Sequence, residues 1–177
     1  KALALQEDNA EYFGLLALIY QAQGQLTPAE DAYRSALQQS GVSPATLVNY
    51  STLLLIRNRE DEAIAFAQKA LQAPGYNKPA LAYTNLGLAY LQKGLFQQAE
   101  SHFRKALEYQ ANLPEVYHNM GLMYDRMRRF PEAVEAFQEA IRLRPSYVAA
   151  HHGLGRVWLV NGQKEKAREA LENVIAL

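Results

Sequence analysis

The 177-residue sequence contains no cysteine, no excess of either charge and no long apolar run. The absence of cysteine excludes disulfides, thiol catalysis and cysteine-ligated metals. Lys plus Arg and Asp plus Glu number 18 each, so the chain lacks the basic excess that marks most nucleic-acid-binding proteins. The longest basic cluster, Arg126 with Arg128 and Arg129, is flanked by Asp125 and Glu132 and is typical of a solvated helix end. We therefore expect no nucleic-acid partner.

The apolar stretches are too short to cross a membrane. Residues 15–20 and 53–56 fall far below the ~18–20 residues that span a bilayer, so we expect no membrane span. No signal peptide is visible, and the sequence starts with Lys1 in the middle of a pattern. We expect this chain to be a fragment of a longer protein.

An internal repeat runs through the whole sequence. Residues 83–90, 117–124 and 151–158 align at a spacing of 34, with a glycine at the same place in each: Gly87, Gly121 and Gly155. An alanine recurs in every unit, at Ala29, Ala63, Ala99, Ala133 and Ala167. One interval is two residues longer, and the extra residues fall in the turn at 74–79.

The repeat divides the chain into units that we predict to form one continuous domain. Residues 1–9 are expected to end the second helix of a preceding unit. Five units follow: 10–43, 44–79 with the longer turn, 80–113, 114–147 and a truncated 148–177.

Each unit is predicted to be a helical hairpin. Tyr83, Leu86 and Tyr90 recur at the spacing of one helix face. A glycine stands where most first helices should stop, at Gly24, Gly94 and Gly162. The repeated glycine, such as Gly87, is expected to let the backbone of a second helix approach. One hairpin cannot bury its apolar face alone, so neighbouring hairpins are predicted to stack into an all-α solenoid.

The repeat resembles the tetratricopeptide repeat family, whose 34-residue unit has the pattern W-x2-L-G-x2-Y, A-x3-F, A and P. The resemblance covers essentially the whole chain, although Ala17 and Ser51 replace the glycine in the first two units. It implies a right-handed α-solenoid of stacked helical hairpins, which binds another protein or peptide in its concave groove.

Helical spacing places one stripe of each first helix in that groove. An asparagine amide can donate to and accept from a peptide backbone, and the resemblance to superhelical family members implies that an asparagine ladder holds a bound chain. The alternative is that asparagine is simply common at this repeat position, and both interpretations stay open. The leucines of the stripe are expected not to pack the hairpins. The predicted peptide-binding residues are Asn49, Thr52, Leu55, Thr84, Asn85, Leu88, Leu91, His118, Asn119, Leu122, His152 and Arg156.

No motif indicates an enzyme, a metal site or a cofactor. The pair His151-His152 points in directions about 100° apart on a helix, so both side chains cannot readily bind one ion. His151 takes the aromatic position of the repeat and is predicted to be a core residue. Phosphate-binding loops and catalytic triads have no matching motif. We expect no catalytic residue, no bound metal and no cofactor.

A narrower resemblance comes from the long turn at 70–79 followed by residues 82–90, which look like the type IV pilus pilotins. That resemblance implies a lipoprotein that assists secretin assembly, with a periplasmic, outer-membrane-associated location; otherwise we expect a cytoplasmic protein. The alternative is a general scaffold or regulatory domain of a larger protein, including one attached to a catalytic domain. A third interpretation is end-to-end self-association through the final helix, where Ile175 and Leu177 have no following unit.

Overall fold

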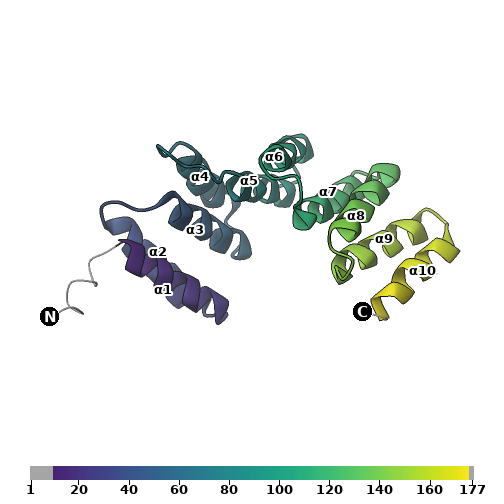
Figure 1. The fold of residues 1–177 in the computed structure, drawn as a ribbon, viewed down its shortest axis with the longest axis horizontal. Helices are drawn as coiled ribbons and strands as arrows, with labels where there is room; N and C mark the ends of the chain where they lie inside the picture. Colours follow the sequence, from purple (N-terminus) through teal and green to yellow (C-terminus); the bar gives the residue numbers. More distant parts are fainter. Residues whose placement is uncertain (1–9, 176–177) are drawn as a thin grey trace. The chain divides into compact units, whose positions relative to one another are not determined.

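The computed structural model describes residues 10–175, with side chains as far as Glu172. Within residues 10–175 the structure consists of ten helices and contains no strand (Figure 1). The predicted helix end at residues 1–9, the side chain of Ile175 and the whole of Leu177 lie outside the described residues. The all-α fold class predicted from the repeat is confirmed.

The helices fall into two compact units, residues 1–93 and 94–177. Where the repeat predicts one continuous domain, the division falls inside the third repeat, between its first and second helices. Unit 1 contains α1 (Ala10–Ala22), α2 (Leu26–Gln38), α3 (Pro44–Ile56), α4 (Glu60–Leu71) and α5 (Ala80–Gln92). Unit 2 contains α6 (Phe96–Tyr109), α7 (Pro114–Arg126), α8 (Phe130–Leu143), α9 (Val148–Val160) and α10 (Lys164–Ile175).

Helical hairpins are the building blocks of both units. In unit 1, α1 packs against α2 and α3 against α4, and the first helices α1, α3 and α5 lie beside one another in chain order. In unit 2 the pairs α7–α8 and α9–α10 form the hairpins, and α7 lies beside α9. The first helices therefore form a row within each unit, which positions the candidate site.

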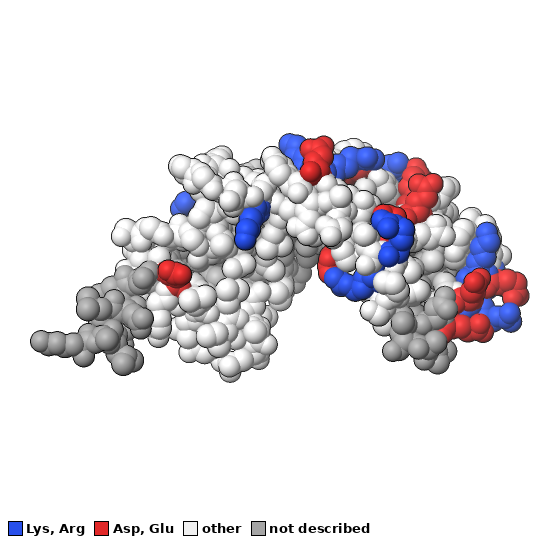
Figure 2. All heavy atoms as spheres, viewed as in Figure 1, with Lys and Arg blue, Asp and Glu red and all other residues white. Residues whose placement is uncertain are grey.

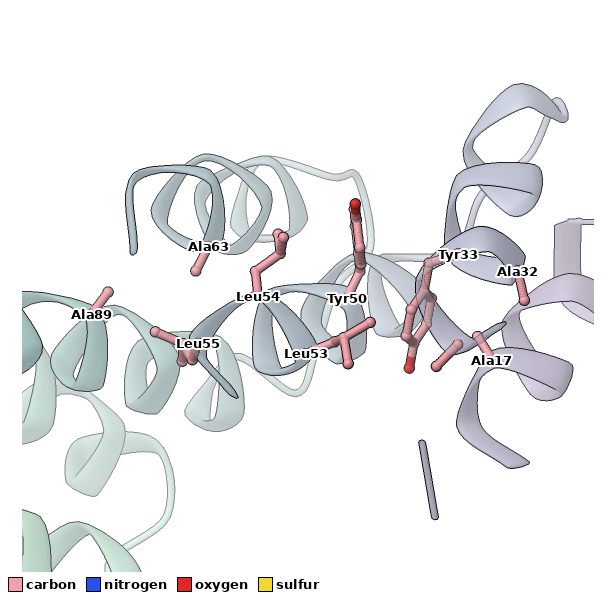
Figure 3. Packing of buried hydrophobic residues seen from close by; sticks show 10 residues of the cluster. Ala17, Ala32, Tyr33, Tyr50, Leu53, Leu54, Leu55, Ala63 and Ala89 are labelled. Atoms are coloured by element: carbon pink, nitrogen blue, oxygen red, sulfur yellow. The ribbon is translucent and has the colours of Figure 1, made fainter. Parts of the chain in front are cut away.

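The core of unit 1 is built from aromatic, leucine and alanine side chains (Figure 3). Tyr33 and Tyr50 have ring centroids 5.2 Å apart, and Leu53 and Leu54 are fully buried beside them. The repeated alanines are also buried, as expected where two helices cross closely. Each large apolar side chain buried here stabilises the fold by about 1.5–3 kcal/mol before conformational costs.

The glycine position of the repeat accepts a neighbouring side chain. A Cβ atom at Gly121 would lie 2.7 Å from the ring of Phe137, and one at Gly155 would lie 2.7 Å from Leu171. The nearest group at both positions is a side chain from the second helix, and at Gly155 the backbone carbonyl oxygen of Ala167 also lies 3.4 Å away. In the second repeat Ser51 takes this position, and its buried hydroxyl donates to the carbonyl of Ala63 at 2.9 Å.

The turn inside each hairpin contains one residue with left-handed backbone. Glycine takes this place three times, with φ of 74° at Gly24, 73° at Gly94 and 77° at Gly162, as the sequence predicts. The same place in the other two repeats is taken by Asn58, at φ 54°, and Arg128, at φ 58°. The turn geometry is thus kept even where the residue is not glycine.

Candidate protein-binding surface

The first-helix row of unit 1 consists of α1, α3 and α5, and it carries the predicted site residues from Asn49 to Leu91. Of these, Asn49, Thr52 and Leu88 are half-buried. The other four, Leu55, Thr84, Asn85 and Leu91, are buried. The row is therefore packed more tightly than the repeat pattern predicts.

Asn85 bonds its own chain. Its side chain is 2% exposed, and its amide nitrogen donates to the carbonyl of Val48 at 3.0 Å and to the hydroxyl of Thr52 at 2.9 Å. Both amide hydrogens therefore join α5 to α3. The amide of Asn85 therefore has no hydrogen left for a bound peptide, and only its oxygen is available to accept one.

The predicted leucines of the row are also buried or half-buried. Leu55 and Leu91 are buried, and Leu88 packs against the core cluster that contains Tyr50 and Leu54. The expectation that these leucines are not needed for packing is wrong. First helices approach one another closely enough to bury the residues between them, and the position within one repeat does not show this.

Other apolar side chains of this row are exposed, among them two on α1 and one each on α3 and α5. Leu15 (56% exposed) and Leu18 lie on α1, Ile56 (51%) ends α3, and Leu81 (48%) lies in the first turn of α5. Leu15 and Leu18 stand at the repeat positions of Asn85 and Leu88, so the repeat register could have identified them in the sequence. Large exposed apolar residues that gather on one set of helices are typical of interaction surfaces.

The row is also nearly free of charge. The helices α1, α3 and α5 have 13 residues each, and Glu11 is their one Asp, Glu, Lys or Arg. On the face shown in Figure 2, most of the surface over α1–α5 is uncharged, whereas acidic and basic side chains gather over the helices of unit 2. A ligand that covers this row meets apolar side chains and has almost no fixed charge to desolvate.

In unit 2 the predicted residue His118 is packed between rings. Its imidazole lies 5.1 Å from the ring of Tyr147 and 5.7 Å from that of Phe137. Burial lowers the pKa of His118, although hydrogen bonds and the charge of Glu115 partly oppose this shift. His118 therefore helps to join α7, α8 and the start of α9, and only its half-exposed edge faces solvent.

The remaining predicted residues of unit 2 differ in their accessibility. Asn119 and Leu122 are half-buried, while His152 and Arg156 are exposed. Arg156 pairs with the buried carboxylate of Asp125, so this side chain joins α9 to α7. The structure thus brings the predicted residues onto two rows, one in each unit.

The other histidine of the pair is part of the core, as predicted. His151 is buried, and its Nε2 lies 2.8 Å from the carbonyl oxygen of Pro145. In the part of the chain that the structure describes, no three His, Cys, Asp or Glu side chains cluster as metal ligands would. The helices described are also all too short or too polar to cross a bilayer.

Comparison with known proteins identifies the repeat. Models of the tetratricopeptide repeat match residues 79–146 in one form, and residues 15–78 and 118–176 in another. Together these matches extend from the first described helix to the last.

The similar proteins include components of type IV pilus systems. The type IV pilus assembly protein PilF of Pseudomonas aeruginosa is 31% identical over 116 residues, which make up 66% of this chain and 46% of PilF. The aligned region thus spans about half the length of that curated relative.

Solved structures show the same fold. The crystal structure of PilW, described as a widely conserved type IV pilus biogenesis factor, superposes with a TM-score of 0.90 at 24% identity, over 99% of this chain and 80% of PilW. The Pseudomonas aeruginosa PilF structure gives 0.79 at 24% identity, over 96% and 76% of the two chains. A thermophilic repeat protein of Thermus thermophilus gives 0.79 at 17% identity, over 94% and 90%. With hairpins, repeat spacing and family models in agreement, the chain belongs to the tetratricopeptide repeat family.

Proposed function

We propose that this chain is a non-catalytic protein-interaction module that acts in type IV pilus assembly. Membership of the repeat family supports the interaction role, and the similarity to PilF and PilW supports the pilus role. The proposal implies a periplasmic protein associated with the outer membrane. The broader alternative, a scaffold or regulatory domain of another system, differs in the partner and not in the mode of binding.

The partner segment is proposed to bind along the first-helix row of unit 1. The observation that carries this proposal is the exposure of Leu15, Leu18, Ile56 and Leu81 on helices that hold almost no charge. Each leucine or isoleucine covered by a partner contributes on the order of 1.5–3 kcal/mol before ordering costs. The half-buried Asn49 supplies an amide group between the apolar side chains.

The predicted peptide-binding residues of unit 2 have a lesser role in this proposal than the row of unit 1. His152 is exposed, and Asn119 and Leu122 keep part of their surface, so these residues can extend the contact of a long segment. Arg156 and Asp125 already form an ion pair, and a ligand that competes for either must replace that pair.

The test uses the full-length protein in the organism that encodes it. We expect the double change Ile56→Ser and Leu81→Ser to reduce surface pili strongly, because a loss of ~1.4 kcal/mol in binding already weakens a complex tenfold. Surface changes of this kind alter folding stability by only about 0.5 kcal/mol, so the protein should accumulate normally. The measurement is the amount of pilin sheared from the cells, with the protein quantified by immunoblot.

The matched control is Tyr109→Ser, which removes an apolar side chain that is 61% exposed at the end of the second helix α6. Pili should be retained in this variant. Normal piliation in the double variant would exclude the row as the working surface. Normal piliation after deletion of the gene would exclude the pilus role and favour the broader alternative.

A further inference from the structure

Among the open pockets of unit 2, two are built alike and lie outside the first-helix row of unit 1. One lies between α8 and α10 over α9, has a volume of about 460 Å³, and is named here the α8–α10 pocket. The other lies beside α7 and α8, has the same volume, and includes Arg104 of α6. Pockets of about 300–1,000 Å³ are the size that commonly binds small ligands or anchoring side chains.

The two pockets are copies of each other in the repeat. Their floors come from the first helix of each hairpin: Tyr117, Met120 and Tyr124 in one, and His151, Leu154 and Trp158 in the other, each pair being 34 residues apart. At the same place in the second helix of each stands a small residue, Ala136 or Ala170. Two copies with the same construction indicate that the openings follow from the repeat.

Unit 1 shows what fills this space when the chain supplies a larger side chain. The residue of the second repeat that aligns with Ala136 and Ala170 is Phe66. Its ring centroid lies 4.8 Å from that of Tyr50, which aligns with Met120 and Leu154, and it packs against the neighbouring apolar clusters. The space over the first helix can thus hold an aromatic ring, and in the two pockets the chain provides only the methyl group of Ala136 or Ala170 there.

The charges around the α8–α10 pocket also favour an aromatic group. The ammonium group of Lys166 lies 4.6 Å from the ring centroid of Trp158, and Arg142 and Glu169 line the same pocket. Cations attract the electron-rich face of an aromatic ring. A ring that enters beside Trp158 therefore meets an aromatic floor and at least one nearby cation.

We propose that the α8–α10 pocket is a second docking site, which takes an aromatic side chain presented by a partner polypeptide. The bound ring occupies the place that Phe66 occupies in unit 1, against Leu154 and Trp158 and next to Ala170. The site lies between second helices, so it does not depend on the function proposed for the first-helix row.

The chain offers its own reporter, because Trp158 is its one tryptophan. The probe is N-acetyl-phenylalanine amide, a capped residue that mimics a side chain on a polypeptide, and the measurement is the emission of Trp158 as probe is added. We expect a saturable change with half-saturation in the millimolar range, as suits so small a ligand. N-acetyl-leucine amide should bind at least several-fold more weakly.

The decisive variant is Ala170→Phe, which supplies the missing ring from within the chain. We expect the thermal unfolding temperature to be kept or raised and the probe affinity to fall by tenfold or more. A second variant, Lys166→Glu, changes an exposed residue and should fold whatever happens at Ala170. Loss of the contact between cation and ring should weaken probe binding by about threefold.

Three results would overturn the proposal. The first is an emission of Trp158 that stays constant to the solubility limit of the probe. The second is a response that persists in a folded Ala170→Phe variant or, where that variant does not fold, is unchanged in Lys166→Glu. The third is equal binding of the leucine and phenylalanine amides, which would show an apolar pocket without the proposed selectivity for aromatic rings.

Discussion

Arg128 holds a backbone conformation that arginine rarely adopts. Its φ of 58° is the left-handed value that glycine supplies at three of the other four hairpin turns. For a residue with a Cβ atom this conformation costs roughly 1–2 kcal/mol, whereas glycine adopts it freely. The repeat has therefore kept the turn and tolerated the strain at this position.

Arg128→Gly should stabilise the protein. We expect the free energy of unfolding to rise by about 0.5–1 kcal/mol, since part of the relieved strain is offset by the greater freedom of glycine in the unfolded chain. Chemical denaturation measures the change. Asn58→Gly is the matched control and should gain less, because asparagine tolerates this conformation better. A larger gain at Asn58 than at Arg128 would contradict the strain argument.

Glu30 is a buried carboxylate surrounded by arginines. Arg34 and Arg59 each lie 2.5 Å from one of its oxygens, and Arg57 lies 2.7 Å from the other in an ionic contact without hydrogen-bond geometry. Burial raises the pKa of Glu30, but the hydrogen bond from Arg59 and the three positive charges outweigh it and hold the pKa below its usual value. The ionised form is thus stabilised by folding.

Glu30→Gln should cost about 1.5–3 kcal/mol of stability near neutral pH, because charged hydrogen bonds are lost. A lowered folded pKa means that this contribution is present above the ordinary glutamate pKa, about 4.3, and disappears as the pH falls through the folded value. The stability difference between wild type and variant should thus be constant at pH 5–7 and shrink below about pH 4. Glu62→Gln, at an exposed carboxylate, is the control and should cost less than about 1 kcal/mol. A difference that grows in acid would contradict this assignment.

At the scale of helices, Phe137 of α8 is wedged between two first helices. Cβ atoms added at Gly121 of α7 and Gly153 of α9 would lie 2.7 and 2.6 Å from its ring. The ring is fully buried, so it has no room to move aside. The approach of α7, α8 and α9 therefore depends on two glycines and one aromatic residue acting together.

Gly153→Ala tests this dependence, because its effect on stability should reverse when the ring of Phe137 is replaced by a smaller side chain. In the wild-type background we expect a loss of stability of about 1 kcal/mol, because the steric overlap of about 1–3 kcal/mol exceeds the gain in helix propensity of roughly 1 kcal/mol. In a Phe137→Leu background the overlap is relieved, and the same change should become neutral or stabilising. Thermal or urea unfolding of wild type, the two single variants and the double variant gives the coupling energy between Gly153 and Phe137. Equal effects in both backgrounds would rule out the wedge.

The helices themselves were predictable from the sequence. The 34-residue spacing, the glycines of the turns and the repeated alanines determine the structure of a single repeat and can be recognised in it. The packing between first helices was not. Leu55 and Asn85 occupy positions that face a groove when a single hairpin is considered, but Leu55 packs in the core of unit 1 and Asn85 bonds the neighbouring first helix α3. Conversely, the repeat alignment alone could have predicted Leu15 and Leu18 as surface residues. They were missed because the prediction followed the repeated asparagine, and in the first unit leucine takes that position.

At the scale of the whole molecule, the two units differ in surface chemistry. The first helices of unit 1 are apolar and almost uncharged, whereas the first helices α7 and α9 of unit 2 carry charged residues such as Glu115 and the ion pair of Arg156 with Asp125. The same fold thus presents one surface suited to apolar contact and one with fixed charges. We propose the apolar row as the main contact for a partner and the α8–α10 pocket as an independent second one.

The central claim is that a partner polypeptide lies on the first-helix row of unit 1 during pilus assembly. A photo-reactive phenylalanine analogue placed at Leu81 of the full-length protein, in living cells of its own host, tests this claim most directly. The account predicts a covalent adduct between this position and a component of the pilus system, identified by mass spectrometry, and a far weaker adduct from the same group at Tyr109. An adduct at Tyr109 with none at Leu81 would contradict it.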